Sequence, residues 1–264
     1  MTVAEVEVIC TEVETRAKDQ EVKITDLRGI LDSDDGRKAA AQLVQGGELT
    51  SADQLLSDQY LRRWLRARRW EPESAARSII AHAQWRVTNM PTGAIQPSEI
   101  SNELACGKAF LLGCDKQGRG ILLFQARKHN GWTRRLEELE KFCCYVMDKA
   151  ITMCDPVLNP RGQISFILDL TDMGAVSMDV QAVQALFKLL GEHYVERLGQ
   201  MVMYNPPYLF WGAWNTLSPL LPPVTKQKIQ VLDPTQRQTL VDMMGASVLP
   251  TEYGGDAELA APAQ

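Results

Sequence analysis

Basic side chains gather in one short segment that is suited to binding phosphate. Five arginines lie between residues 62 and 69, within the sequence LRRWLRARRW. Arginine presents a planar fork of N–H donors that matches two phosphate oxygens, so a phosphate or an anionic lipid head group is a natural partner. The alternative is a solvated helix face neutralised by nearby acids, which is the commoner role of a charged run. Both interpretations remain open on this segment alone.

Two further positions carry groups of the same chemistry. Thr225 and Lys228 precede an apolar segment that is typical of a strand, and together they can share one phosphate. Glu196 precedes another such segment and can form an ion pair with basic groups. Each pattern is also common at ordinary helix and strand ends, so neither defines a site by itself.

Enzyme signatures are missing from the chain. It contains no G-x-S-x-G nucleophile elbow and no glycine-rich phosphate loop of either common type. Asp169 and Asp172 follow an apolar segment, but no glycine-rich loop accompanies them. We therefore expect Asp169 to be a structural acid satisfied by hydrogen bonds. We expect no catalytic residue, no enzymatic activity and no cofactor.

Metal-binding patterns are equally weak. The six cysteines form no C-x-x-C pair, and only three histidines are present, so no zinc site is expected. The segment from Asp32 to Gly36 resembles the start of a calcium loop, but position 12 of that loop is Leu43 rather than glutamate. We expect a turn that caps a helix.

The region 194–232 points to an apolar ligand. No charged side chain occurs between Arg197 and Lys226, yet five prolines interrupt the stretch. A membrane-spanning helix needs about 20 apolar residues without such breaks. The pattern instead predicts a strand, a turn, a short aromatic-rich helix and a second strand. An apolar helix bounded by prolines is suited to form a lid over an apolar ligand.

Composition narrows the class of protein. The chain has 264 residues, of which 45% are hydrophobic and 23% charged, as in ordinary globular proteins. Its net charge of -5 provides no basic field for nucleic acid, so no nucleic-acid partner is expected. The N-terminus lacks the basic and apolar regions of a secretory signal, and the cysteines are interpreted as reduced thiols. We expect a cytoplasmic protein.

The hydrophobic period changes along the chain. We expect an acidic N-terminal arm at 1–50, helical or partly disordered, then a helical module at 51–97 and an α/β domain at 98–264. Within them, the patterns predict helices at 51–68, 73–87, 136–153, 178–190 and 234–244, and strands at 109–112, 120–125, 163–170, 200–204 and 229–232. Strands that alternate with helices favour a mostly parallel sheet.

Four segments in order resemble the CRAL-TRIO (Sec14-like) lipid-transfer family. They are LLSDQYLRRWLRARRWEPESA, FILDLTDMG, the stretch from YVERLGQ to TKQKI, and LPTEYGGD, and they cover about residues 50–256. The resemblance implies an N-terminal helical module and an α/β domain whose mostly parallel sheet forms a hydrophobic slot. One lipid would lie in this slot beneath a gate helix that opens at a membrane.

The resemblance also implies roles for individual residues. The lipid head group would be bound by Arg68, Arg69, Glu196, Thr225 and Lys228. The slot would be lined by Leu122, Ile164, Phe166, Leu168, Met201 and Met203. The gate would comprise Tyr208, Leu209, Phe210, Trp211, Trp214, Leu217, Leu220 and Leu221.

Two departures from the family pattern affect the expected ligand. Small hydroxyl residues and a tyrosine line the choline pocket of members that exchange phosphatidylcholine, whereas Ile164, Phe166 and Leu122 stand here. Apolar side chains cannot hydrogen-bond a phosphate, and burying one beside them is costly. Pro222 also replaces an acid before the threonine. A second ligand, if present, is therefore expected to be apolar, such as a sterol or an isoprenoid.

The leading hypothesis is a monomeric phosphatidylinositol-binding and transfer protein that contacts membranes transiently. Four basic residues, Arg127, Lys128, Arg134 and Arg135, can add attraction to anionic leaflets, or can simply form a solvated loop. One alternative is a dedicated carrier of an apolar metabolite. Another is a lipid-sensing regulatory module that acts on a protein partner, which the acidic arm could bind. A hydrolase is the last alternative.

Overall fold

The structure is a computed structural model that describes the backbone of residues 3–263. It describes the side chains of residues 14–263 except those of residues 213, 217 and 220. The chain divides into two compact units, which meet in sequence between Ala94 and Ile95. Each unit has its own secondary structure and its own core, and each is described separately below.

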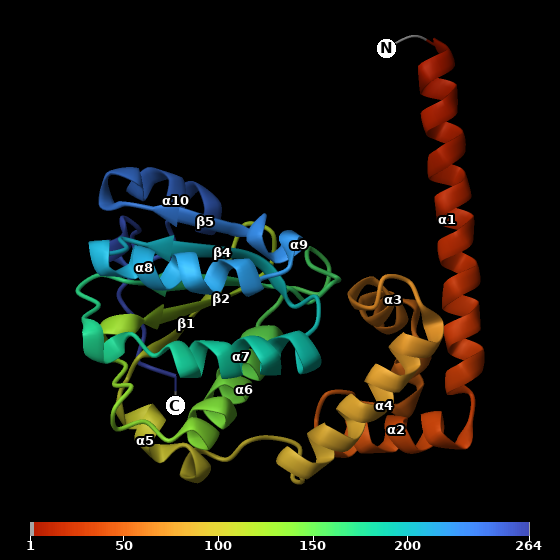
Figure 1. Cartoon of the computed structure of the whole chain (residues 1–264), viewed down its shortest axis with the longest axis horizontal. Helices are drawn as coiled ribbons and strands as arrows, with labels where there is room; N and C mark the ends of the chain where they lie inside the picture. The colour runs from red at the N-terminus through yellow and green to blue at the C-terminus, as the bar shows by residue number, and fades with distance from the viewer. Residues whose placement is uncertain (1–2, 264) are drawn as a thin grey trace. The chain divides into compact units, whose positions relative to one another are not determined.

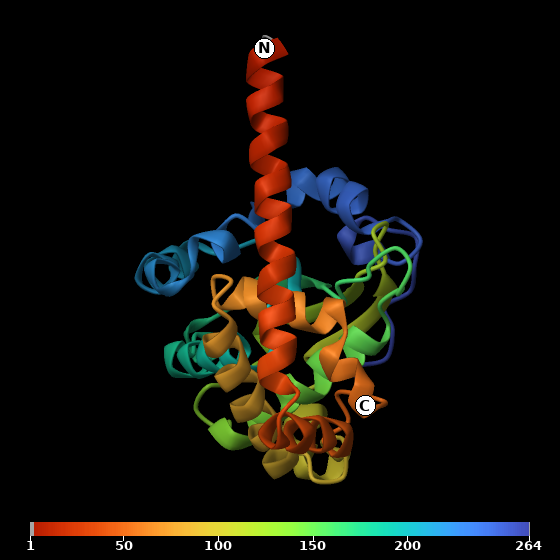
Figure 2. The same ribbon diagram turned by 90° about the vertical axis from the view of Figure 1, so that its right-hand side faces the viewer.

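The first unit is entirely helical. It contains α1 (Val3–Leu31), α2 (Asp34–Gln45), α3 (Asp58–Ala67) and α4 (Pro72–Asn89), with a short 3₁₀ helix η1 (Ala52–Leu56). The first turns of α1 extend beyond the other helices of this unit (Figure 1, Figure 2). Its last turns bury Ile24, Leu27 and Leu31. The boundary expected near residue 50 therefore falls inside this unit, because α1 and α2 contact α4 directly.

Local capping explains where these helices begin. The helix predicted from residue 51 is wrong at its start, because Ser57 has extended backbone and its hydroxyl accepts a hydrogen bond from the Tyr60 N–H (3.4 Å). Residues 52–56 form η1 instead. The predicted cap at the Asp32 turn is confirmed, since the Ser33 hydroxyl accepts from the Gly36 N–H (3.3 Å). α4 begins at Pro72.

The second unit is built on a five-stranded sheet in the order β1-β2-β3-β4-β5. The strands are β1 (Ala109–Cys114), β2 (Gly120–Gln125), β3 (Ile164–Asp169), β4 (Leu198–Tyr204) and β5 (Ile229–Leu232). β1 pairs antiparallel with β2, and every other neighbouring pair is parallel. The predicted mostly parallel α/β sheet is confirmed.

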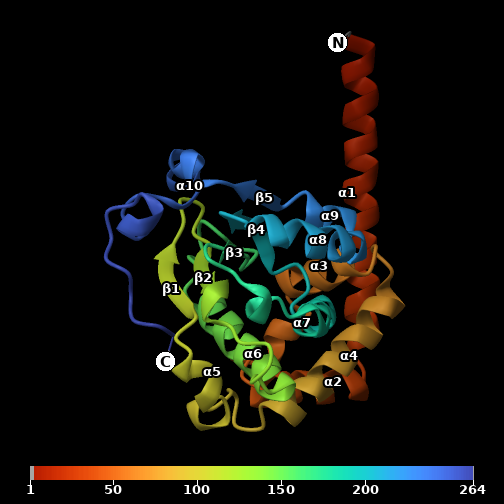
Figure 3. The ribbon, with the colours of Figure 1, turned by 60° about the vertical axis from the view of Figure 1, so that its left-hand side comes forward.

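Helices connect the parallel strands in sequence. α6 (Leu136–Thr152) leads to β3, α7 (Val180–His193) leads to β4, and α8 (Tyr208–Leu217) with α9 (Pro223–Lys226) leads to β5. The remaining helices of this unit are η2 (Pro97–Glu99), α5 (Ser101–Ala105), η3 (Ala126–Lys128), η4 (Ala175–Ser177), η5 (Ser218–Leu220), η6 (Pro234–Gln236), α10 (Arg237–Met244) and η7 (Thr251–Tyr253). Right-handed crossovers that all step in one direction place their helices on one face of a sheet. Figure 3 shows α6, α7 and α8 on one side and α10 on the other.

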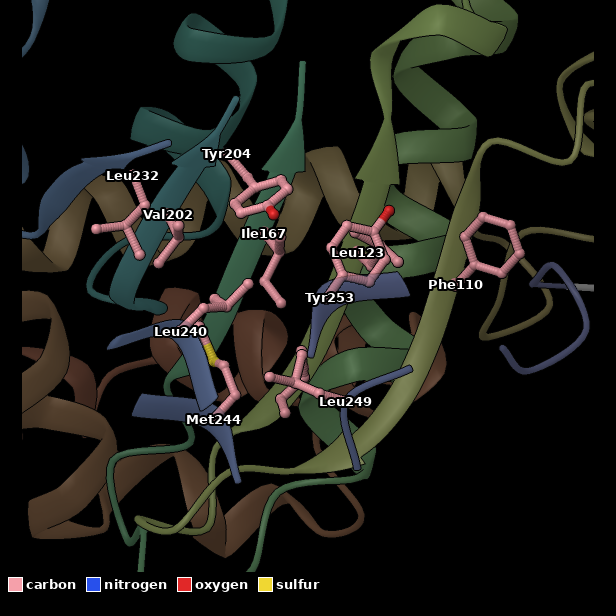
Figure 4. Close-up of a cluster of buried hydrophobic side chains, with 11 residues drawn as sticks. Phe110, Leu123, Ile167, Val202, Tyr204, Leu232, Leu240, Met244, Leu249 and Tyr253 are labelled. Carbon is pink, nitrogen blue, oxygen red and sulfur yellow. The ribbon is translucent and has the colours of Figure 1, made fainter. Parts of the chain in front are cut away.

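The opposite face of the sheet forms a closed core. The strands contribute Phe110, Ile121, Leu123, Ile167, Val202, Tyr204 and Leu232, and the C-terminal region contributes Leu240, Met244, Leu249 and Tyr253 (Figure 4). These side chains are all buried. Burial of this apolar surface stabilises the sheet and the C-terminal region together. None of the helices that the structure describes is long and apolar enough to cross a membrane.

Candidate functional site

The face of the sheet toward α8 carries an apolar surface. Directly paired residues of neighbouring strands point to the same face. The register pairs Leu122 with Phe166, Phe166 with Met201, and Met201 with Ile229. All six predicted lining residues lie on this face: Leu122, Ile164, Phe166, Leu168, Met201 and Met203. Their role in ligand binding stays a prediction.

This apolar surface is less completely covered than the core on the other face. Ile121, Ile167 and Val202 on the core face are fully buried. By contrast, Phe166 and Met201 on the α8 face are only half-buried. Apolar side chains in the middle of a sheet are normally sealed by close packing. Leu122, Ile164 and Met203 on the same face are buried, so the cover of this surface is partial.

Helix α8 covers part of this surface with aromatic rings. Phe210 and Trp214 stack with 5.8 Å between ring centroids, and both belong to the cluster that contains Met201 and Met203. Their spacing of four residues places them on one face of the helix. Phe210 and Trp214 therefore lie against this apolar surface, and their role as a lid over a ligand stays a prediction.

The other face of α8 points away from that cluster. Tyr208 is 94% exposed and Trp211 is 41% exposed, and Leu209 is also exposed. Leu221 follows the helix and is half-buried. The predicted gate positions Leu217 and Leu220 have side chains outside the part that the structure describes. A group of large apolar side chains on an exposed helix face is typical of an interaction surface.

Three of the predicted head-group residues lie near the amino ends of β4 and β5. The Lys228 ammonium donates a hydrogen bond to the carbonyl of Leu198 (2.8 Å), which is two residues from Glu196. The Thr225 carbonyl accepts a hydrogen bond from the Lys228 backbone N–H (3.0 Å). Glu196 has φ 57°. The fold of the second unit thus brings Glu196, Thr225 and Lys228 into one region.

The two predicted arginines belong to the first unit. Arg68 ends α3, donates through Nε to the Ser78 hydroxyl (2.7 Å), and lies 5.8 Å from the Trp64 ring. Arg69 is exposed and has φ 54°. The structure gives Arg68 a packing role and leaves the Arg69 side chain facing solvent. Their joint role with the three residues of the second unit stays a prediction.

Hydroxyl groups are turned away from the apolar surface. Ser165, the one hydroxyl residue of β3, lies on the opposite face, where its Oγ donates to Asp115 Oδ2 (2.6 Å). Gln200 Nε2 donates to the same carboxylate (3.1 Å). Burial alone would raise the pKa of Asp115, but hydrogen bonds from Ser165 and Arg119 outweigh it and lower this pKa. The α8 face of β3 is consequently apolar along its length.

A polar cavity of about 340 Å³ lies at the carboxyl ends of β3 and β4. It is lined by charged and polar residues, among them Arg127, Asp169, Asn205, Arg237 and Glu252. Asp169 accepts hydrogen bonds from the Thr171 N–H (2.9 Å), Arg127 (2.9 Å) and the Tyr253 hydroxyl (2.8 Å). The prediction of a structural, fully satisfied Asp169 is confirmed.

Sequence reasoning missed the partners of this carboxylate. Tyr253 also accepts from Gln125 Nε2 (3.0 Å), so one tyrosine joins the ends of β2 and β3 to the C-terminal segment. Burial raises the pKa of Tyr253, which keeps its proton available as a donor. The pattern LPTEYGGD marked the segment, but only the fold shows what its tyrosine binds. Within the described residues, no three histidine, cysteine, aspartate or glutamate side chains form a metal-binding group.

Comparison with known proteins assigns the family. The family model of the CRAL/TRIO domain matches residues 104–255, which is more than half of the chain. The chain belongs to the CRAL/TRIO domain family. Its fold is similar to that in the crystal structure of Sfh5, with a TM-score of 0.64 over 90% of this chain and 94% of that chain, at 14% identity.

Several curated proteins are similar in sequence. A CRAL-TRIO domain-containing protein of Schizosaccharomyces pombe is 29% identical over 66% of this chain and 40% of its own length. The phosphatidylinositol transfer protein CSR1 of Eremothecium gossypii is 26% identical over 76% of this chain and 48% of its own length. The SEC14 cytosolic factor of the same organism is 26% identical over 77% of this chain and 71% of its own length. The chain thus spans less than half of the first two relatives.

Proposed function

We propose that this protein binds one phosphatidylinositol molecule against the apolar face of its sheet and exchanges it with membranes. The observation that supports this most is the apolar ladder of Leu122, Phe166, Met201 and Ile229 beneath the aromatic face of α8, in which all but the buried Leu122 are half-buried. Family membership and the names of similar proteins, including a phosphatidylinositol transfer protein, support the choice of ligand.

The physical problem that such a protein solves is desolvation of the lipid tails. A diacyl lipid carries tens of methylene groups, and each costs about 0.8 kcal/mol when it is moved into water. An apolar surface covered by α8 replaces that water during transit. Binding of the exposed face of α8 to a membrane would favour an open state, because a ligand shifts an equilibrium toward the state that it binds better.

The head-group role of Thr225 and Lys228 can be tested by lipid transfer between vesicles. We expect the double variant Thr225→Ala with Lys228→Ala to lose phosphatidylinositol transfer by a factor of about 10 to 100, since a charge-assisted hydrogen bond contributes about 1.5–3 kcal/mol. Lys226→Ala is the matched control, because Lys226 is exposed on the same short helix α9. Circular dichroism would check that each variant is folded. Equal transfer by the folded double variant and the control would refute the head-group site.

A second candidate function is a dedicated carrier of an apolar metabolite such as a sterol or an isoprenoid. The observation that favours it is the orientation of Ser165, which leaves Leu122 and Phe166 as an apolar wall. In that case the double variant Thr225→Ala with Lys228→Ala would still bind its apolar ligand. Transfer of radiolabelled sterol, measured beside phosphatidylinositol in the same vesicles, distinguishes the two candidates.

A further inference from the structure

Trp132 is the most exposed tryptophan side chain in the part of the chain that the structure describes. It is 83% exposed, in the loop between η3 and α6. Two valines, Val176 and Val180, are also exposed, and the Gly131 N–H donates to the Val176 carbonyl (2.9 Å), so the two segments touch. An exposed aromatic side chain in a segment that touches one with exposed valines indicates an interaction surface rather than an isolated exposed residue.

The loop that presents Trp132 is held in place on both sides. The Asn130 side-chain oxygen accepts from the Trp132 N–H (3.0 Å) and the Thr133 N–H (3.3 Å). Arg134 donates through Nε to Asp179 (2.6 Å), and Asp179 also caps α7 by accepting from the Ala182 N–H (3.0 Å). These bonds fix the loop against the start of α7. A loop that is already fixed loses little backbone entropy when it binds.

The charged side chains of the same loop are all positive. Residues 127–135 read RKHNGWTRR and contain four cations and no acid. Asp169 and Asp179 neutralise Arg127 and Arg134, whereas Lys128 donates to a neutral carbonyl and Arg135 is exposed. Tryptophan favours the head-group level of a bilayer, and each nearby cation is attracted to anionic lipids. Charge and ring together fit an anionic membrane surface better than a protein.

The position of the loop in the fold agrees with that occupant. The loop follows β2, η4 follows β3, and α8 follows β4. Because β2, β3 and β4 are parallel, these three segments begin at the same edge of the sheet, the one formed by the carboxyl ends of its parallel strands. Figure 1 shows α7 and α8 starting toward the same end of this unit. The exposed Tyr208 at the start of α8 therefore lies at the edge that also carries Trp132.

We propose that Trp132, Val176 and Val180, with Lys128 and Arg135, form a second membrane-contact surface that anchors this edge of the sheet to an anionic bilayer. This inference rests on the proposed lipid exchange, for which α8 must meet the same membrane. A fixed anchor beside the start of α8 would keep the protein oriented while the helix moves.

The test is vesicle binding by the full chain. Vesicles of phosphatidylcholine alone and of phosphatidylcholine with phosphatidylserine are mixed with wild type, Trp132→Ala and Val157→Ala, and binding is measured by flotation. Val157 is the matched control, because it is 84% exposed but lies in the loop before β3, at the opposite edge of the sheet. We expect Trp132→Ala to weaken binding to the anionic vesicles about tenfold, as for the loss of one large buried apolar side chain. Val157→Ala should bind as wild type does.

Further readouts separate this inference from the proposed function. Arg135→Glu should reduce the preference for phosphatidylserine, and native mass spectrometry should show that Trp132→Ala retains the same bound lipid as wild type. Equal vesicle binding by wild type and Trp132→Ala would overturn the inference. So would a change in self-association of Trp132→Ala by sedimentation velocity with no change in vesicle binding, which would identify a contact between copies. Trp132-dependent vesicle binding by a protein that holds no lipid would instead refute only the proposed function.

Discussion

The Tyr253 side chain joins the C-terminal segment to the ends of β2 and β3. Its hydroxyl donates to Asp169 and accepts from Gln125, and the side chain is 2% exposed. The following glycine, Gly254, has φ 90°, and a side chain at Gly255 would meet the Leu249 carbonyl at 2.0 Å. The segment thus needs glycine after the tyrosine to turn back onto the sheet.

Removal of this hydroxyl should destabilise the protein. We expect Tyr253→Phe to lower the free energy of unfolding by about 1–3 kcal/mol, because Asp169 and Gln125 would each lose a partner in a buried place. Urea denaturation followed by circular dichroism measures the change. Tyr208→Phe is the control, since Tyr208 is 94% exposed and its loss of a hydroxyl should have no effect. An unchanged stability of Tyr253→Phe would show that the network contributes nothing.

At this scale, residue types were easier to predict than their partners. The absence of a glycine-rich loop was enough to predict that Asp169 is a structural acid. Its partner Tyr253 lies 84 residues away, and no local pattern connects the two. Lys108 and Glu103 form a buried ion pair only five residues apart, but the contact of Lys108 with His129 spans 21 residues and has no local pattern either.

Helix α8 divides its aromatic residues between two faces. Phe210 is buried in the cluster beneath the helix, whereas Trp211 is 41% exposed. The two rings are neighbours in sequence and contact each other edge to face. Adjacent positions on a helix point about 100° apart, so one ring can cover the sheet while the other remains outside.

A charge on the outer face should affect exchange more than stability. We expect Trp211→Asp to slow lipid exchange with vesicles several-fold while lowering the free energy of unfolding by only about 0.5–1.5 kcal/mol, because the contact with Phe210 is lost. Stopped-flow exchange of a fluorescent lipid measures the exchange rate, and urea denaturation measures the free energy of unfolding. Val157→Asp places the same charge at an exposed position on the opposite edge and should leave exchange unchanged. Wild-type exchange by Trp211→Asp would mean that this ring does not meet the membrane.

The strands and helices of the second unit agree closely with those predicted from the sequence. The alternation of apolar strands with amphipathic helices predicted β1–β5 and α6–α8, with ends shifted by a few residues. The first unit was harder, because a serine at position 57 interrupts one helical pattern and the weakly patterned residues before 50 fold as two helices. Polar residues on an exposed helix face do not distinguish a helix from a solvated arm.

The stability of the whole molecule depends on several buried carboxylates. Glu48 in the first unit contacts Arg63 (2.5 Å) and His82, both of which are buried. Burial alone would raise the pKa of Glu48, but His82 and Arg63 outweigh it and hold this pKa well below 4.5. Asp115 and Asp179 in the second unit also have lowered pKa values.

These lowered pKa values predict acid sensitivity. A carboxyl whose pKa is lower in the folded than in the unfolded state stabilises the fold fully above its unfolded pKa, about 4.3 for glutamate. That stabilisation is lost as the pH falls through the folded pKa. We therefore expect the free energy of unfolding to fall steeply below about pH 4. A smaller decrease should begin below about pH 6.5, because burial lowers the pKa of His129 and protonation then favours the unfolded chain.

Replacement of Glu48 should remove part of this dependence. We expect Glu48→Gln to cost about 3–5 kcal/mol at pH 7, because Arg63 would remain buried without its carboxylate. Its unfolding free energy should then vary less with acid than that of wild type. Glu73→Gln, at an exposed acid of α4 in the same unit, is the control and should keep the wild-type profile. If the free energy of unfolding of Glu48→Gln fell with decreasing pH as steeply as that of wild type, the lowered pKa of Glu48 would be contradicted.

At the scale of the whole molecule, the family and the order of its parts could be predicted from four short motifs. The head-group site could not be established in the same way, because Arg68 and Arg69 belong to one unit and Thr225 and Lys228 to the other. Motifs identify which residues have suitable chemistry. They do not report that Arg68 already binds Ser78 or that Lys228 binds the Leu198 carbonyl.

Native mass spectrometry of the purified full chain, followed by extraction and identification of the bound molecule, tests the central proposal most directly. We expect one phosphatidylinositol per chain, either as purified or after incubation with vesicles that contain it. A sterol, an isoprenoid or another apolar molecule in its place would contradict phosphatidylinositol as the ligand and identify a dedicated carrier. A chain that remains without lipid after incubation with phosphatidylinositol and sterol vesicles would contradict lipid binding on the apolar face of the sheet.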